Sequence, residues 1–335
     1  MGSVLLALLI LLPAAWIGVA FFIEGMARRA SRLGRLEAPA CFRADPPVGD
    51  RARLAFLGDV QRGIADVARP LAAALAEEKA DLLVSSGDFI AHGEAPYYGV
   101  ALDAFARAPV LTPTRVVPGN HDLFPRRWRD PTGGYALFEA RFGPADWLCR
   151  VGPVLVAGID DAVRGVTDED LAALRAALAA HEGPWVAVCH RPPRLFLEEG
   201  APVEEDLVDL VAFLEAHPPL LVVCGHLHER FERVIGGVRY VVNAHGGDVH
   251  GLGLDRGPFE LLRVDVEADG RASERFTTHR RRPWPRVYWN QLAVRCWWSR
   301  RRGLGRVLAA PAALVLGALG VRAPLERPVS TEPGS

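Results

Sequence analysis

Leu220–His228, which reads LLVVCGHLH, joins an apolar run to two histidines that are one residue apart. An apolar run of this length is typical of a buried strand. His226 and His228 follow it on one turn that begins at Gly225, where alternate side chains can point into the same cleft. A lone histidine is usually packed or solvated. The pair indicates a binding site if other segments of the chain supply partners.

Other apolar runs of the chain end in polar residues in the same way. They are LAFLGD (54–59), DLLVSSGD (81–88), TRVVPGNHD (114–122), VLVAGIDD (154–161) and WVAVCH (185–190). Helical patterns lie between several of these runs. One is a leucine stripe that follows Thr167 and Asp170, which approximate a capping box. FERVIGGVRYVVNA (231–244) predicts a hairpin that turns at Gly236-Gly237. Strands that alternate with helices predict an α/β fold.

The polar residues at the strand ends predict a metal site. Strand C-termini in open α/β sheets converge on one crevice, and polar groups buried there without partners are costly. Carboxylate, amide and imidazole donors suit Mn, Fe, Zn or Mg, and the absence of thiolate ligands argues against structural zinc. The candidates are too many for one ion and predict two ions that share an aspartate. They are Asp59, Asp88, Asn120, His121, His190, His226 and His228.

Taken in order, these strand ends resemble the five motifs of calcineurin-like metallophosphoesterases. The matching segments are GDVQ (58–61), GD (87–88), GNHD (119–122), His190 and GHLH (225–228). The resemblance covers roughly Arg53 to Asp248, and GNHD together with GHLH is its most specific part. It implies a four-layer α/β-β-α sandwich and a dinuclear metal centre.

The resemblance also implies a role for each matching residue. Asp59 and His228 would hold the first metal, and Asp88 would bridge the two metals. The second metal would be held by Asn120, His190 and His226. His121 would stabilise the phosphate or act as general acid, with Asp122 orienting its ring. Two ions about 3.5–4 Å apart lower the pKa of a bridging water to near neutrality, so that hydroxide can attack phosphorus in line. This predicts a hydrolase of phosphate esters or anhydrides.

Gln61 departs from the first motif, which normally places a histidine there. A glutamine can offer a carbonyl oxygen to the first metal, or it can form only a hydrogen bond and leave the first site looser. A glutamine at this place is also similar to a subset of the family that includes manganese-dependent ADP-ribose/CDP-alcohol diphosphatases. We therefore expect two divalent ions, with Mn²⁺ favoured over Fe, Zn or Mg. The alternative is a weak or inactive relative that serves as a membrane-localised binding or regulatory module.

Composition limits the range of functions. The chain has 335 residues, half of them hydrophobic, which predicts one large domain with appendages. A net charge of −1 argues against a polyanion binder, and we expect no nucleic-acid partner. The five cysteines form no CxxC pair, which favours a reducing compartment.

The N-terminus predicts a membrane anchor. Val4–Ile23 contains twenty residues without a charge, which is enough to cross a hydrocarbon core of roughly 30 Å. A cleaved signal peptide is the alternative, but the run lacks a basic n-region and is long for one. Four arginines between residues 28 and 35 place the main domain on the cytoplasmic side by the positive-inside rule. The expected division is an anchor (1–23), a linker (24–50), the phosphoesterase domain (51–278) and a tail (279–335).

The tail predicts contact with membrane lipid. Residues 275–306 contain ten arginines and no acidic residue, and tryptophans are interspersed among them. The apolar run 307–321 that follows is too short for a full span, so an interfacial segment is expected. A helix packed on the domain and a nucleic-acid-binding segment are the alternatives. The expected substrate is a phosphorylated small molecule or a lipid-linked phosphate.

Several further residues are weaker candidates. Asp160 and Asp161 follow a strand and could touch a leaving group or a ligand, although a structural turn explains them equally well. Arg164 and Arg191 could reach a phosphate, and His245 could approach the metals.

Overall fold

The computed structural model describes residues 2–123, 132–193, 203–243, 246 and 258–301. The chain divides into two compact units, which are Leu33–Trp289 and Met1–Arg32 together with Asn290–Ser335. Every predicted metal ligand belongs to the first of these units, which also contains both β-sheets.

The first sheet has five strands in the order β11-β10-β1-β2-β3. Their bounds are Ala272–His279 (β11), Phe259–Val266 (β10), Ala52–Leu57 (β1), Leu82–Ser85 (β2) and Thr114–Val116 (β3). β1, β2 and β3 are parallel, whereas β10 runs antiparallel to both β1 and β11. The parallel strands therefore deliver their C-terminal ends to one edge of the sheet.

The second sheet has six strands in the order β4-β5-β6-β7-β9-β8. Their bounds are Trp147–Val151 (β4), Val154–Gly158 (β5), Trp185–Val188 (β6), Leu221–Cys224 (β7), Val238–Asn243 (β9) and Arg230–Ile235 (β8). β5, β6, β7 and β9 are parallel, and β4 and β8 are antiparallel edge strands.

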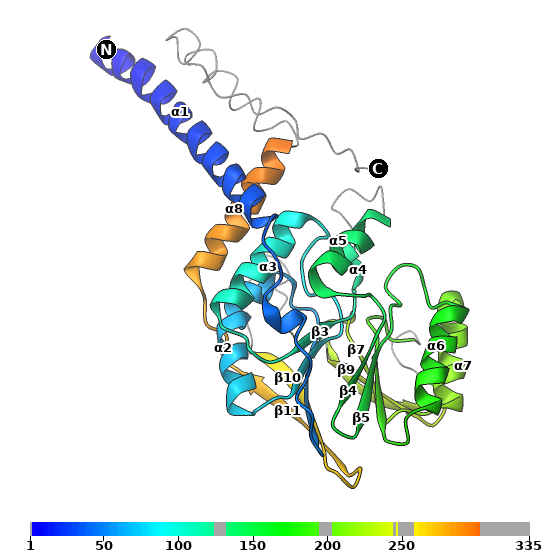
Figure 1. Ribbon diagram of the computed structural model, residues 1–335. Coiled ribbons are helices and arrows are strands. Elements are labelled where there is room, and N and C mark those ends of the chain that lie inside the picture. The colour runs from blue at the N-terminus through cyan, green and yellow to red at the C-terminus, as the bar shows by residue number, and fades with distance from the viewer. Residues whose placement is uncertain (1, 124–131, 194–202, 244–245, 247–257, 302–335) are drawn as a thin grey trace. The chain divides into compact units, whose positions relative to one another are not determined.

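The two sheets pack face to face. Apolar side chains from both form one buried cluster, for example Phe56 and Val84 from the first sheet against Val156, Val188 and Val223 from the second. The outer face of the second sheet is covered by α6 (Asp168–Ala179) and α7 (Val208–Ala216), and α2 (Ile64–Glu77) and α3 (Ala95–Arg107) lie beside the first sheet (Figure 1). A mixed α/β fold with two sheets is thus confirmed.

The six predicted buried strands are present as β1, β2, β3, β5, β6 and β7. Each strand stops before the polar residues that follow it, so the candidate ligands lie on the turns. The hairpin of β8 and β9 turns at Gly236 and Gly237, which have φ of 58° and 77°. The capping box is also confirmed, since Thr167 Oγ1 accepts from Asp170 N.

Shorter helices complete the fold. They are α4 (Asn120–Leu123), α5 (Thr132–Phe142) and the 3-10 turns η1 (Ala40–Phe42), η2 (Gln61–Gly63) and η4 (Glu205–Leu207). The last helix, α8, spans Pro285–Arg301.

Part of the predicted linker belongs to the core of the compact unit. Phe42 lies 6.0, 5.4 and 4.9 Å, centroid to centroid, from the rings of Phe89, Phe105 and Phe142. Aromatic rings at these separations attract one another in addition to burying apolar area. The compact unit therefore begins at Leu33, well before the predicted boundary at residue 51.

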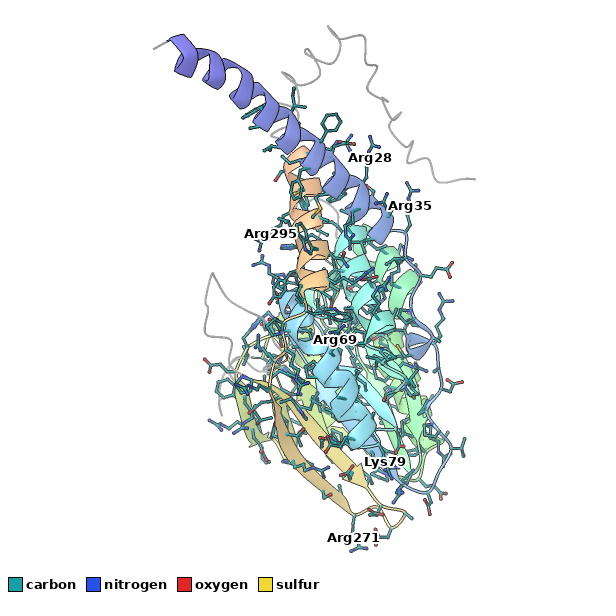
Figure 2. The ribbon with its side chains drawn as sticks, turned by 90° about the vertical axis from the view of Figure 1, so that its left-hand side faces the viewer. Arg28, Arg35, Arg69, Lys79, Arg271 and Arg295 are labelled. Atoms are coloured by element: carbon teal, nitrogen blue, oxygen red, sulfur yellow. The ribbon has the colours of Figure 1, made fainter. Side chains whose placement is uncertain are left out.

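The start of the predicted tail belongs to the same unit. Trp284 N donates to Ala65 O over 3.0 Å. The guanidinium of Arg69, a residue of α2 that is labelled in Figure 2, lies 3.9 Å from the Trp284 ring centroid. Tyr288 donates its hydroxyl to Asp66 Oδ1 over 2.6 Å. Residues 279–289 are thus fixed to α2, the helix that follows Gln61.

The other unit is helical in its described part. It contains most of α1 (Gly2–Leu33), where Arg29 Nε donates to Asn290 Oδ1 over 2.8 Å and Arg300 pairs with Glu24 over 3.3 Å. In the described part of the chain, no helix reaches the length and apolarity required of a membrane span, so the predicted span is not confirmed. The apolar run 307–321 lies outside the described residues.

Candidate metal centre

The predicted ligands lie on turns that leave the C-terminal ends of parallel strands from both sheets. The first three turns follow β1, β2 and β3, and the other two follow β6 and β7. In that order the turns carry Asp59 and Gln61, then Asp88, then Asn120 and His121, then His190, then His226 and His228.

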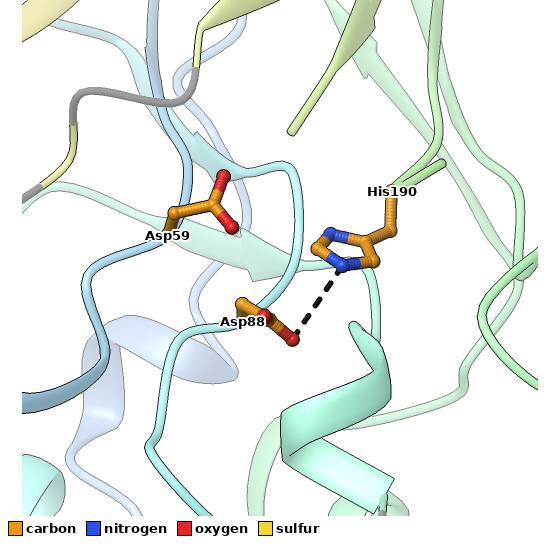
Figure 3. Close-up of side chains that lie close together, drawn as sticks. All are labelled: Asp59, Asp88 and His190. Atoms are coloured by element: carbon orange, nitrogen blue, oxygen red, sulfur yellow. Dashed lines mark ion pairs between the residues drawn. The ribbon is translucent and has the colours of Figure 1, made fainter. Parts of the chain in front are cut away.

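Asp59, Asp88 and His190 form the centre of the site. Each offers one ligand atom, these atoms lie within 4.8 Å of one another, and the three side chains are buried. Figure 3 shows them pointing toward a common point, with Asp88 Oδ1 3.5 Å from His190 Nε2. Two carboxylates buried this close together repel each other unless a cation or a proton lies between them. The donor set is one that divalent metals accept.

The ring of His190 provides a direct test of fit for a cation. Its Nδ1 lies 2.9 Å from Ser86 O, a carbonyl that can only accept, so Nδ1 carries a hydrogen and Nε2 is the nitrogen that can face a cation. That Nε2 faces Asn120 Oδ1 at 3.0 Å, His226 Nδ1 at 3.3 Å and the Asp88 carboxylate. Polar atoms of three other turns thus meet at His190 Nε2. Oxygen and imidazole nitrogen atoms are a donor set that a divalent cation accepts, so the predicted second-metal residues fit a metal.

The predicted first-metal residues form the other part of the cluster. His228 Nε2 lies 3.5 Å from Asp59 Oδ1, and the other Asp59 oxygen accepts from His226 N over 3.0 Å. Gln61 is in the site, but it directs its amide nitrogen at Asp88 Oδ2 over 2.9 Å. The residue in the place of the usual histidine therefore acts here as a hydrogen-bond donor to Asp88, the predicted bridging residue.

The backbone at the site is strained. Left-handed φ angles occur at Asp59 (53°), Gln61 (41°), Asp88 (50°), His226 (72°) and His228 (55°). Among the described non-glycine residues only one more, outside the site, has positive φ. Such conformations cost about 1–3 kcal/mol each and cluster at functional sites.

Two motif glycines allow the ligand turns to approach each other. A Cβ on Gly119 would lie 2.2 Å from Asp88 N, and a Cβ on Gly87, whose φ is 91°, would lie 2.4 Å from His190 Nδ1. Neither position can accommodate a side chain without moving a ligand turn.

His121 lies beside the ligand cluster and reaches solvent. Its side chain is 40% exposed, and its Nε2 lies 4.0 Å from Asp88 Oδ2. The ring Nδ1 is 3.1 Å from Ala91 O, and the backbone N donates to Asp88 Oδ1 over 2.8 Å. His121 can therefore present Nε2 to a ligand that approaches the cluster.

Asp122 does not occupy the position predicted for it. The ring of His121 is oriented by the Ala91 carbonyl, not by the Asp122 carboxylate. That carboxylate is buried and accepts from the backbone N of Phe89, Ile90 and Gly119, over 3.2, 2.8 and 2.8 Å. It thus joins the two turns that carry Asp88 and Asn120. The prediction failed because a motif does not specify which neighbouring donors its carboxylate will meet.

The site shifts the pKa values of two groups. Burial, and then repulsion from His190, lowers the pKa of His226 to about 4. Burial, and then the neighbouring Asp88, raises the pKa of Asp122 to about 8. His226 is therefore neutral at pH 7, which is the form in which an imidazole can ligate a metal.

The weaker candidates are engaged in local contacts. The guanidinium of Arg191 pairs with Glu204 and Asp206, and that of Arg164 pairs with Asp146, Asp160 and Asp170. These ion pairs hold both arginines in the protein framework. His245 lies outside the described residues.

This fold and this cluster define a class, that of metal-dependent hydrolases of phosphate esters. The family model for calcineurin-like phosphoesterases matches residues 52–230, and the chain belongs to this family. No curated protein matches the sequence.

Two solved structures are similar to this chain. One is "Structure of PhoD", with 10% identity, a TM-score of 0.51 and coverage of 77% of this chain and 79% of that one. Another is a purple acid phosphatase from yellow lupin (Lupinus luteus), with 13% identity, a TM-score of 0.48, and coverage of 70% and 55%. The chain thus spans about half the length of the lupin protein. At these identities the likeness concerns the fold alone.

Proposed function

We propose that this protein is a metal-dependent phosphoesterase that hydrolyses a phosphate ester or a diphosphate with two divalent cations, Mn²⁺ first among them. One observation carries the proposal. Side-chain oxygen and nitrogen atoms from three other turns lie within 3.5 Å of His190 Nε2. Polar groups are costly to bury without a partner, and a divalent cation accepts this set of donors.

The remaining residues supply the rest of the chemistry. Cations held by these side chains supply Lewis acidity and a water nucleophile at neutral pH. His121, half exposed beside the cluster, stabilises negative charge on a phosphoryl oxygen and protonates the leaving oxygen through Nε2. The Ala91 carbonyl keeps the ring in that orientation. Asp122 keeps the Asp88 and Asn120 turns together and stays clear of the substrate.

For the substrate we propose a phosphorylated small molecule, with a diphosphate preferred. Gln61 supports this preference through its similarity to the diphosphatase subset of the family. Because glutamine replaces the usual histidine, the first-metal position has one imidazole fewer. The Gln61 amide donates to Asp88 instead.

The test is a phosphatase and diphosphatase assay of the purified full chain with added Mn²⁺. Activity is expected in the wild type and is strongly reduced in Asp88→Asn and His121→Ala. Asp103→Asn is the matched control, because Asp103 is also a buried carboxylate but pairs with Arg107 and Arg286. Equal rates in all four proteins would contradict the proposal. Bound metal without turnover would favour the alternative, a binding or regulatory module.

We also propose that the chain associates with membrane lipid and keeps its phosphoesterase unit on the cytoplasmic side. The uncharged stretch Val4–Ile23 and the arginines that follow it support this proposal. So does the solvent exposure of large apolar residues on α1, namely Trp16, Val19, Phe21 and Phe22. Fractionation tests the association, and a reporter fused after Arg35 tests the side. Recovery in the soluble fraction, or a reporter active outside the cytoplasm, would contradict it.

A further inference from the structure

We propose that Asp161 is a positioning residue that sets the orientation of His190 at the metal centre. The inference rests on the proposed function, because it treats His190 as a metal ligand. Asp161 follows β5, the strand next to β6, and β6 leads directly into His190. No family motif quoted for this chain includes Asp161.

The Asp161 carboxylate is fully buried and binds the backbone behind the ligand. One oxygen accepts from His190 N and the other from Arg191 N, each over 2.8 Å. A carboxylate that accepts two successive amides fixes the plane of the peptide between them. The position of the His190 Cα, and hence the starting point of its ring, is thereby set from behind.

Arg191 completes this arrangement. Its Nε donates to Asp161 O over 2.6 Å, and its guanidinium pairs with Glu204 and Asp206 beside η4. The turn that carries His190 is thus fixed to β5 on one side and to η4 on the other. The His190 ring is then oriented from its far end by the Ser86 carbonyl at 2.9 Å. Removing the rear support leaves the ring oriented only by Ser86 and by the ligands themselves.

Asp160 offers a matched control from the same turn. It is equally buried, but its oxygens contact Ala162 N at 3.1 Å and Arg164 Nε at 3.1 Å, away from His190. Asp160→Asn therefore removes a buried charge at the same place in the fold without touching the ligand turn. Any difference between the two variants reports the contact with His190 and Arg191.

The experiment measures Mn²⁺ binding to the full chain by isothermal titration, together with thermal unfolding. In Asp161→Asn the amide retains one acceptor and turns an N–H₂ group toward a backbone donor. We expect this variant to bind one of the two ions about 10–100-fold more weakly, the usual effect of losing support behind a ligand. Asp160→Asn should bind both ions within about twofold of the wild type, even if it melts equally early. In Asp161→Asn, the rate constant at saturating Mn²⁺ should lie closer to the wild-type value than the rate constant at limiting Mn²⁺ does.

Two outcomes overturn the positioning role. In the first, Asp161→Asn binds both ions as the wild type does. In the second, both variants lose affinity in proportion to their loss of stability. If the wild type binds no metal, the proposed function itself fails, and this result is distinct from the other two.

A second variant tests the same positioning role if Asp161→Asn does not fold. Arg191→Gln removes the pairs with Glu204 and Asp206 and the bond from Nε to Asp161 O, and it leaves the backbone N–H of residue 191 bound to the Asp161 carboxylate. We expect a weaker loss of affinity for the same ion, roughly 3–10-fold, because the carboxylate still accepts both backbone N–H groups. Unchanged affinity in a folded Arg191→Gln protein would contradict the arrangement described here.

Discussion

The two halves of the candidate metal centre are built differently. In the half around His190, donor atoms of Asn120, His226 and Asp88 all lie within 3.5 Å of one ring nitrogen. Both Asp122 and Asp161 support the turns of this half from behind. Its ligands are thus oriented before any cation arrives.

The half around Asp59 has a neutral amide where the motif places an imidazole. His228 Nε2 lies 3.5 Å from Asp59 Oδ1, and Gln61 donates its amide N–H to Asp88. An amide is a weaker, neutral ligand, and here it must rotate before its oxygen can face a cation. The difference teaches that one substitution in a motif can make two neighbouring metal positions unequal. We expect one ion to be held tightly and the other to exchange with the medium.

The largest effect should come from the residue that both halves share. Asp88→Ala removes the carboxylate that is predicted to bridge the two ions, and we expect the rate to fall by roughly 10³-fold or more, since both positions would lose a charged ligand. The measurement is the rate with saturating Mn²⁺, with folding checked by circular dichroism. A folded Asp88→Ala protein within tenfold of the wild type would exclude a shared carboxylate.

Removing one imidazole at a time, from either half, tests the difference between the two halves directly. His226→Ala should abolish binding of the tight ion, with a loss of about 100-fold in affinity, whereas His228→Ala should affect only the weak ion. Metal content after dialysis against a mild chelator distinguishes them: one ion is retained in the wild type and in His228→Ala, and none in His226→Ala. The reverse pattern would show that the halves are assigned wrongly.

Restoring the histidine should make the halves more alike. Gln61→His should raise the affinity of the weak ion by roughly 10-fold, because an imidazole replaces a neutral amide. Gln61→Ala is the control, and it should leave the tight ion within about threefold of the wild type. Titration calorimetry then shows whether the two binding steps converge. If Gln61→His leaves both steps unchanged, Gln61 is not what makes the positions unequal.

A carboxylate outside the centre should give the smallest effect. Burial raises the pKa of Asp146 to about 6 from 3.8, so the folded state binds the proton more tightly than the unfolded state. Stability from this group is therefore present at low pH and is lost as pH rises from about 4 to about 6. Between pH 4 and pH 6 the melting temperature of Asp146→Asn should change by a few degrees less than that of the wild type. If the melting temperatures of the two proteins change equally with pH, Asp146 is not the group responsible.

The sequence predicted more of the site than of its support. Apolar runs and the polar residues that end them are local patterns, so β1, β2, β3, β5, β6 and β7 could be located, and their parallel order brings the ligands together. β4, β10 and β11 were not predicted. Every side chain of β11 is exposed or half-exposed, so this strand shows no apolar alternation.

The contacts of Asp122 and Asp161 could not be predicted in the same way. Each accepts backbone N–H groups from a different segment of the chain, and only the folded turns bring those donors near. The pair of aspartates at 160–161 was visible in the sequence, but nothing there shows that one faces His190 and the other faces Arg164.

The bonds of Trp284 and Tyr288 to α2 have a practical consequence for anyone who wants to isolate the phosphoesterase half. A fragment that stops at residue 278 would lose the hydrogen bond from Tyr288 to Asp66 and the contact between the Trp284 ring and Arg69. It would also uncover the helix that begins three residues after Gln61. A fragment that spans residues 33–289 keeps both contacts. The ends of an expressible fragment therefore follow from Trp284 and Tyr288 rather than from the extent of the motifs.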